Sequence, residues 1–135
     1  MSEKAMLLLK RLERAAAGLD HSEMCACHGG YCHQQIILNE TRTATFDWDN
    51  YRTADPTWDV ARFIVTLQKL ALRKLDSMKA LDAVGAAFYK TYTATSGFEV
   101  AKHLPFYKAA HCLKRARDRL EPMLDEGLRI LAEEM

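Results

Sequence analysis

The sequence predicts a single, mainly α-helical domain with one small β-hairpin near its start. Three observations favour this fold class. Apolar residues recur at helical spacing in five stretches, two short apolar runs flank a turn-like segment, and hydrophobic side chains make up 49% of the 135 residues. A chain of this length buries enough apolar surface to fold without help from a disulfide or a metal.

The first helix is expected from Glu3 to about Gly18. Its apolar side chains at helical spacing are Leu8, Leu9, Leu12 and Ala16. The next stretch, residues 20–34, is rich in His, Cys and Gly and has no regular period, so we expect a loop there. Loops of this kind often carry function.

A β-hairpin is expected from two short runs, residues 35–38 and 44–46, with turn-like residues 39–42 between them. An isolated two-stranded hairpin is only marginally stable in water. We therefore expect it to lie against helices.

Four further helices account for the rest of the chain. The first begins at Asp55-Pro56, because Asp caps the orphan amides of a first turn and Pro needs no N–H there. The second is expected over 77–93, ended by Ser96-Gly97, and the others begin near Pro105 and at Glu121. The side chains expected to face inward from the 77–93 helix are Leu81, Val84, Ala87, Phe88 and Tyr92.

Charge and hydropathy narrow the class of protein. The net charge of +1 argues against a dedicated nucleic-acid binder, since such binding depends on concentrated Lys and Arg. The basic run at 108–119 is interleaved with apolar residues and is expected to be the solvated face of a helix. No run approaches the ~20 apolar residues that a membrane span needs, and the charged amino terminus predicts a cytoplasmic protein.

The four cysteines are expected to be free thiols or metal ligands. Three of them crowd into residues 25–32, so one alternative is a zinc site made by Cys25, Cys27, Cys32 and His33. Structural zinc sites normally use two ligand pairs with a longer spacer, so this spacing is a poor match.

Three segments in order carry a resemblance to a known family: Cys27–Leu38, Phe46–Asp49 and Asp55–Arg62. Together they resemble the catalytic core of the aminoglycoside phosphotransferase and choline kinase family, nearest to its spore-coat-like branch. The resemblance implies the helical C-terminal lobe of the protein-kinase-like phosphotransferases. In that lobe His28 would be the structural histidine of the catalytic loop, Asp59 the carboxylate that braces the loop, and Asp47 the metal-binding aspartate.

Two departures from the family pattern fall at the chemical centre. Gly30 stands where the family has its catalytic Asp, and Gln35 stands where it has a metal-binding Asn. A glycine offers no group to orient a hydroxyl or accept its proton, and a Gln amide is displaced by roughly 1 Å or more. In addition, the residues before Ala26 leave no room for the family's nucleotide-covering N-terminal lobe, so we expect that lobe to be absent.

Three functional hypotheses remain open. The chain, as one domain over 1–135 with a motif core at about 20–70 and a helical remainder at 71–135, is a catalytically impaired phosphotransferase-like domain that acts by binding or assembly. Alternatively, it is a phosphotransferase that uses ATP and Mg²⁺ on a small-molecule hydroxyl and is completed by another chain. The third hypothesis is the zinc-binding module. An exposed apolar face in place of the missing lobe predicts a homodimer or a separate N-lobe chain as partner.

Overall fold

The computed structural model describes residues 1–116 and 121–135. Its helices are α1 (Glu3–Ala16), α2 (Thr57–Leu75), α3 (Asp82–Ser96), α4 (Leu104–Arg115) and α5 (Glu121–Glu133). The short strands are β1 (Cys25–Cys27), β2 (Ile36–Leu38), β3 (Thr43–Thr45) and β4 (Arg52–Ala54), and a 3₁₀ turn, η1, spans His33–Gln35. The mainly helical class with a small hairpin is confirmed.

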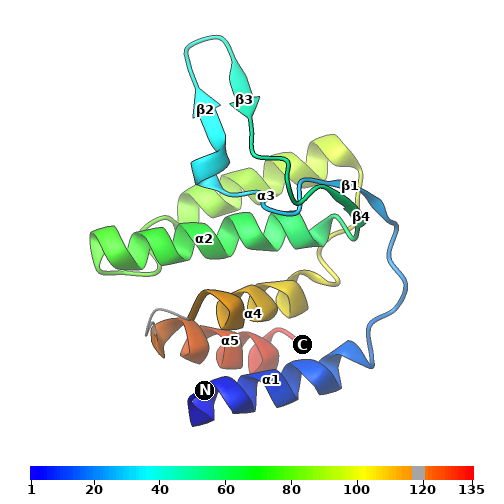
Figure 1. Ribbon diagram of the computed structural model, residues 1–135, viewed down its shortest axis with the longest axis vertical. Helices are drawn as coiled ribbons and strands as arrows, with labels where there is room; N and C mark the ends of the chain where they lie inside the picture. The colour runs from blue at the N-terminus through cyan, green and yellow to red at the C-terminus, as the bar shows by residue number, and fades with distance from the viewer. Residues whose placement is uncertain (117–120) are drawn as a thin grey trace.

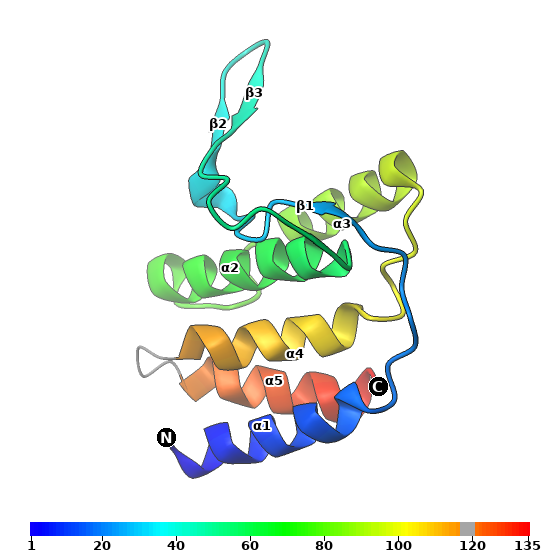
Figure 2. The ribbon, with the colours of Figure 1, turned by 45° about the vertical axis from the view of Figure 1, so that its right-hand side comes forward.

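Helix α4 lies between two pairs of helices, with α2 and α3 on one side and α1 and α5 on the other (Figures 1 and 2). Helix α4 contacts α2 on one side and both α1 and α5 on the other, while α3 contacts α2. The main core lies between α1, α4 and α5, with Val65 reaching it from α2; its largest members include Leu8, Leu12, Met123 and Ile130. A side chain at Gly127 would meet Leu8 at 2.7 Å, so this glycine allows α5 to approach α1 closely.

Local capping fixes several helix ends. Ser2 Oγ accepts a hydrogen bond from the Ala5 amide at the start of α1, and Asp55 Oδ1 accepts one from the Thr57 amide at the start of α2. Gly97 ends α3 with φ of 74°, a left-handed conformation that glycine adopts without steric cost. The expected start at Asp55-Pro56 and stop at Ser96-Gly97 are thus confirmed.

Residues 20–34 were predicted to form a loop, but in the structure residues 25–27 of this stretch form the strand β1. Strand β1 pairs antiparallel with β4, with Cys25 opposite Ala54 and Cys27 opposite Arg52. Strands of three residues show too little alternation to be recognised, and the partner lies more than twenty residues away in sequence. The pairing brings residues before His28 next to the start of α2.

The hairpin forms at the expected place, with Ile36 opposite Thr45 and Leu38 opposite Thr43. The expectation that it lies against helices is wrong for its outer part. The hairpin stands away from the helical body (Figures 1 and 2), and Ile37 and Leu38 are 60% and 72% exposed.

Helix α3 begins later than expected, at Asp82, because residues 77–82 form turns with bonds from the Ala80 amide to Ser77 and from the Asp82 amide to Lys79. Its inward face also differs: Val84 is 48% exposed, Ala87 is exposed as well, and Gly85 is the buried residue of α3. The part of the expected basic face at 117–120 lies outside the described residues. Within the described chain, each helix is too short or too polar to cross a membrane.

Candidate functional site

The segment Cys27–Cys32, here called the braced loop, is held by the first turn of α2. Asp59 accepts hydrogen bonds from the backbone amides of His28, at 2.7 Å, and Gly29, at 2.9 Å. Trp58 Nε1 donates to the Gly29 carbonyl at 3.1 Å. Hydrogen bonds to a carboxylate are stronger than those between neutral groups, so Asp59 fixes the loop directly to α2.

His28 is buried and joins the braced loop to the end of the hairpin. Its Nδ1 accepts a hydrogen bond from the Gly30 amide at 3.1 Å, so Nε2 carries the proton and donates to the Phe46 carbonyl at 2.8 Å. The imidazole therefore ties Gly30 to the segment that leads into Asp47. This arrangement is consistent with the structural role that the family resemblance implies for His28.

The two loop glycines have different reasons to be there. Gly29 has φ of +78°, and an added Cβ would lie 2.0 Å from the Asn50 carbonyl oxygen. Only glycine fits such a close approach at a positive φ. Gly30 has ordinary space, because a Cβ there would meet His28 and Asn50 at 3.5 and 3.6 Å. The position that the family resemblance assigns to the catalytic Asp thus has room for a Cβ but carries no side chain.

The structure brings Gln35 and Asp47 together across the hairpin. Gln35 Nε2 donates to Asp47 Oδ2 at 3.5 Å, and the Cys32 thiol donates to Gln35 Oε1. Asp47 has φ of 62°, a left-handed conformation that a non-glycine residue adopts at a cost in free energy. To act as a metal ligand, Gln35 would have to turn its amide oxygen toward Asp47, because here the oxygen faces Cys32 and the nitrogen faces Asp47.

The cysteines do not assemble into the zinc site that was one alternative. The Sγ atoms of Cys25 and Cys27 lie 3.8 Å apart, but the Cys32 thiol donates a hydrogen bond to Gln35 rather than joining them. The described residues contain no group of three or more His, Cys, Asp or Glu side chains placed to hold a metal ion. Burial, with a smaller effect from the charge of Asp59, raises the pKa of Cys27 to about 12, so this thiol is protonated near neutral pH.

A cavity of about 240 Å³ lies beside the braced loop. Its lining combines thiols, aromatic rings and a carboxylate, including Cys25, Cys27, Tyr31, Trp48, Asp59 and Tyr92. Burial raises the pKa of Tyr92 to about 12, so its hydroxyl stays protonated near neutral pH. The Trp48 ring centroid lies 4.6 Å from that of His28 and forms one wall next to the loop.

Sequence reasoning missed two contributors to this region. The backbone of Asn50 lies so close to Gly29 that no side chain fits there, and no local sequence pattern predicts this tertiary contact. The buried side chains of Asp55 and His103 pair at 2.8 Å and connect the start of α2 to the start of α4. No local sequence pattern indicates that His103 pairs with Asp55, forty-eight residues earlier.

Comparison with known proteins places most of the chain in one family model. The model of the phosphotransferase enzyme family (APH) matches residues 3–104, which is most of the chain. The chain therefore belongs to this family, and the resemblance to the aminoglycoside phosphotransferases is confirmed at the level of the family. No curated protein and no solved structure matches the chain.

Proposed function

We propose that this phosphotransferase-family chain is a C-lobe-type domain in which phosphoryl transfer is impaired, and that it acts by binding or assembly. The observation that carries the proposal is the braced loop. Asp59 and His28 hold the loop in place, yet Gly30 presents no carboxylate at the position where the family has its catalytic Asp.

The missing carboxylate removes a specific chemical step. Kinase-like transfer uses an aspartate that orients the acceptor hydroxyl and accepts its proton. A positioned acid–base group of this kind contributes about 10²–10⁴-fold to the rate. Since a Cβ at Gly30 would make ordinary contacts, the absence of a side chain is not required for packing.

The arrangement at Gln35 supports the same conclusion. Mg²⁺ prefers oxygen ligands, and the family uses an amide oxygen together with the metal-binding aspartate. Here the Gln35 oxygen accepts from Cys32, which leaves Asp47 as the oxygen ligand of this pair. These two residues as arranged fit a Mg²⁺ ion poorly.

The hairpin supplies a surface for assembly. Five large apolar side chains on or next to it are exposed: Ile37, Leu38, Phe46, Trp48 and Tyr51. Unpaired strand edges and contiguous apolar surface favour association with another chain. We propose a second copy of this chain as the partner at this surface, and a separate N-lobe chain as the competing partner.

Light scattering on the purified chain tests the assembly role. We expect a dimer, and we expect the double variant Ile37→Ser, Leu38→Ser to be monomeric with an unchanged helical circular dichroism spectrum. Leu75→Ser is the matched control, since Leu75 is 55% exposed at the far end of α2. A monomer at high concentration, or a dimer unaffected by the hairpin variant, would contradict homodimerisation.

The alternative function is an ATP- and Mg²⁺-dependent phosphotransferase acting on a small-molecule hydroxyl and completed by another chain. The observation in its favour is the position of Asp47, held in a left-handed conformation beside Gln35, because strained residues cluster at functional sites.

Calorimetric titration with Mg-ATP separates the two functions. The comparison is between the unaltered chain and the double variant Gly30→Asp, Gln35→Asn, which restores the family pattern at both positions. Binding by the unaltered chain would support the enzyme. If neither protein releases heat, restoring the family residues at positions 30 and 35 does not restore nucleotide binding. That outcome would favour the assembly role.

A further inference from the structure

A larger cavity lies between α2, α3 and α5, on residues that the phosphotransferase motifs do not include. It has a volume of about 690 Å³ and shares no lining residue with the braced loop or with Asp47. Its apolar part is formed from α2, α3 and the turn between them, by Ile64, Leu67, Met78, Leu81 and Tyr89. Small-molecule sites are typically cavities of this size with a largely apolar lining.

Gly85 keeps part of this cavity open. It is the buried residue of α3, and an added Cβ would have no neighbouring atom within 4 Å. Glycine is among the least favourable residues inside a helix, so a packing or functional reason for it is expected. No close packing explains Gly85. The space above it is therefore available to a bound molecule.

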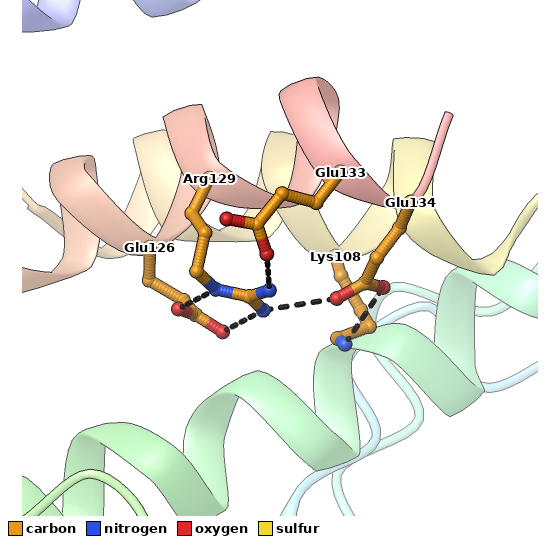
Figure 3. Close-up of polar contacts among 5 residues, drawn as sticks. All are labelled: Lys108, Glu126, Arg129, Glu133 and Glu134. Carbon is orange, nitrogen blue, oxygen red and sulfur yellow. Dashed lines mark hydrogen bonds and ion pairs between the residues drawn. The ribbon is translucent and has the colours of Figure 1, made fainter.

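On the polar side of the cavity, Arg129 and Lys108 contact the carboxylates of Glu126 and Glu133, which line the cavity, and of Glu134, which lies next to its lining (Figure 3). The Arg129 guanidinium donates to Glu126 at 2.8 and 2.9 Å, to Glu133 at 2.8 Å and to Glu134 at 2.9 Å. Lys108 lies 3.5 Å from Glu134. Because Arg129 is already engaged by three carboxylates, it has little capacity left for an anionic ligand, whereas carboxylate oxygens can accept further hydrogen bonds.

A buried acceptor completes the polar side. Gln68 Oε1 is buried and has no hydrogen-bond partner among the described residues, while the same side chain hydrogen-bonds to Glu126. An unpaired buried acceptor costs free energy, and a donor on a ligand would remove this cost. At the rim, Lys79 and Asp82 are exposed side chains of opposite charge, so they favour neither sign of ligand.

We infer that this cavity binds a small primary amine with an apolar body. The apolar body lies in the space above Gly85, against Ile64 and Tyr89. The ammonium group donates to Gln68 Oε1 and to the carboxylate of Glu126. The inference goes beyond the proposed function, and the two can fail separately because they share no residue.

Titration of the isotope-labelled full chain with n-hexylamine, followed by NMR, tests this site. Hexanol and hexanoate are chain-matched probes that keep the apolar body and change the polar group. We expect shifts at the cavity residues of α2, α3 and α5, with hexylamine binding at least tenfold more tightly than hexanoate. Gly85→Leu is expected to abolish binding, while Val84→Leu, an addition on the exposed side of α3, is expected to leave it unchanged.

A second variant keeps the test decisive if Gly85→Leu does not fold. Gln68→Leu preserves most of the side-chain volume and removes the acceptor, so hexylamine should bind about tenfold more weakly and hexanol nearly as before. Hexanoate binding as tightly as hexylamine, shifts outside the cavity, or binding unaffected by Gly85→Leu in a folded protein would each overturn the inference. Binding of hexylamine that Gln68→Leu does not weaken would do so as well.

Discussion

Asp59 and His28 are linked by a hydrogen bond of 2.7 Å from the His28 backbone amide to the Asp59 carboxylate, across thirty-one residues of sequence. This contact, with the one to Gly29, makes the loop conformation depend on the first turn of α2 rather than on the loop alone. The loop is held in this shape although Gly30 carries no side chain.

Asp59→Ala should destabilise the fold by about 2–4 kcal/mol, because it leaves two backbone donors without their charged acceptor. Asp59→Asn keeps one acceptor oxygen and should cost roughly half as much. Urea unfolding followed by circular dichroism gives both values. Asp49→Ala, at an exposed position, is the control and should change stability by less than about 0.5 kcal/mol. Equal effects of Asp59→Ala and Asp49→Ala would contradict the bracing role.

Gly29→Ala and Gly30→Ala form a matched pair at adjacent positions. The first places a methyl group 2.0 Å from the Asn50 carbonyl oxygen at a positive φ, whereas the second makes ordinary contacts. We expect Gly29→Ala to cost more than about 3 kcal/mol or prevent folding, and Gly30→Ala to change stability by less than about 1 kcal/mol. Thermal melts of the two variants check this. A Gly30→Ala variant as unstable as Gly29→Ala would show that the loop differs from this geometry.

Stability should fall in mild acid because of His111. Its Nε2 donates to the Trp58 carbonyl at 3.1 Å, and burial lowers its pKa to about 3, with the nearby positive charge of Arg115 acting in the same direction. The unfolded chain binds a proton near pH 6.5 that the folded chain does not bind until about pH 3. The free energy of unfolding therefore decreases as pH falls through this window, by up to about 1.4 kcal/mol per pH unit.

His111→Gln is the matching variant, since it retains a donor for Trp58 but does not titrate. Urea unfolding between about pH 4.5 and 7 should show a shallower pH dependence for the variant, by close to one proton. Other acid-sensitive groups, such as Asp55 and His33, are unchanged in both proteins. Parallel pH profiles would contradict a neutral, buried His111.

The ion pairs around Arg129 should make a modest, salt-dependent contribution to the free energy of unfolding. Hydrogen bonding to Arg129 lowers the pKa of Glu126, but Arg129 is 41% exposed, so screening limits the benefit. Arg129→Met should cost about 1 kcal/mol at about 0.05 M salt and clearly less at about 1 M, with Arg129→Lys intermediate. Denaturant melts at the two salt concentrations measure this. A loss that does not change with salt would indicate packing rather than charge.

The helices and their ends were largely predictable because their signals are local. Asp55-Pro56 and Gly97 act on neighbouring residues, and the apolar spacing in α1 and α5 repeats over several turns. The inward face of α3 was not predictable in this way. Its alanines and Val84 offer more than one apolar stripe, and only the placement of α2 decides that Gly85 is buried.

The residues of the candidate site that belong to a sequence motif could be predicted. The contacts between segments distant in the sequence could not. The positions of His28, Asp47 and Asp59 follow from the family resemblance, and their roles in this chain stay predictions. The close approach of Asn50 to Gly29 and the bond from Cys32 to Gln35 follow from how the hairpin meets the loop. The β1–β4 pairing is of the same kind, because it depends on the whole intervening chain.

The most direct test of the central claim is phosphate release or transfer from Mg-ATP, followed by phosphorus NMR, for the unaltered chain and for Asp47→Ala. If the loop is a phosphotransferase scaffold without its transfer chemistry, the two proteins should show the same background rate. Turnover by the unaltered chain that is lost in Asp47→Ala would contradict the account, because it would show that the site transfers phosphate despite the glycine at position 30.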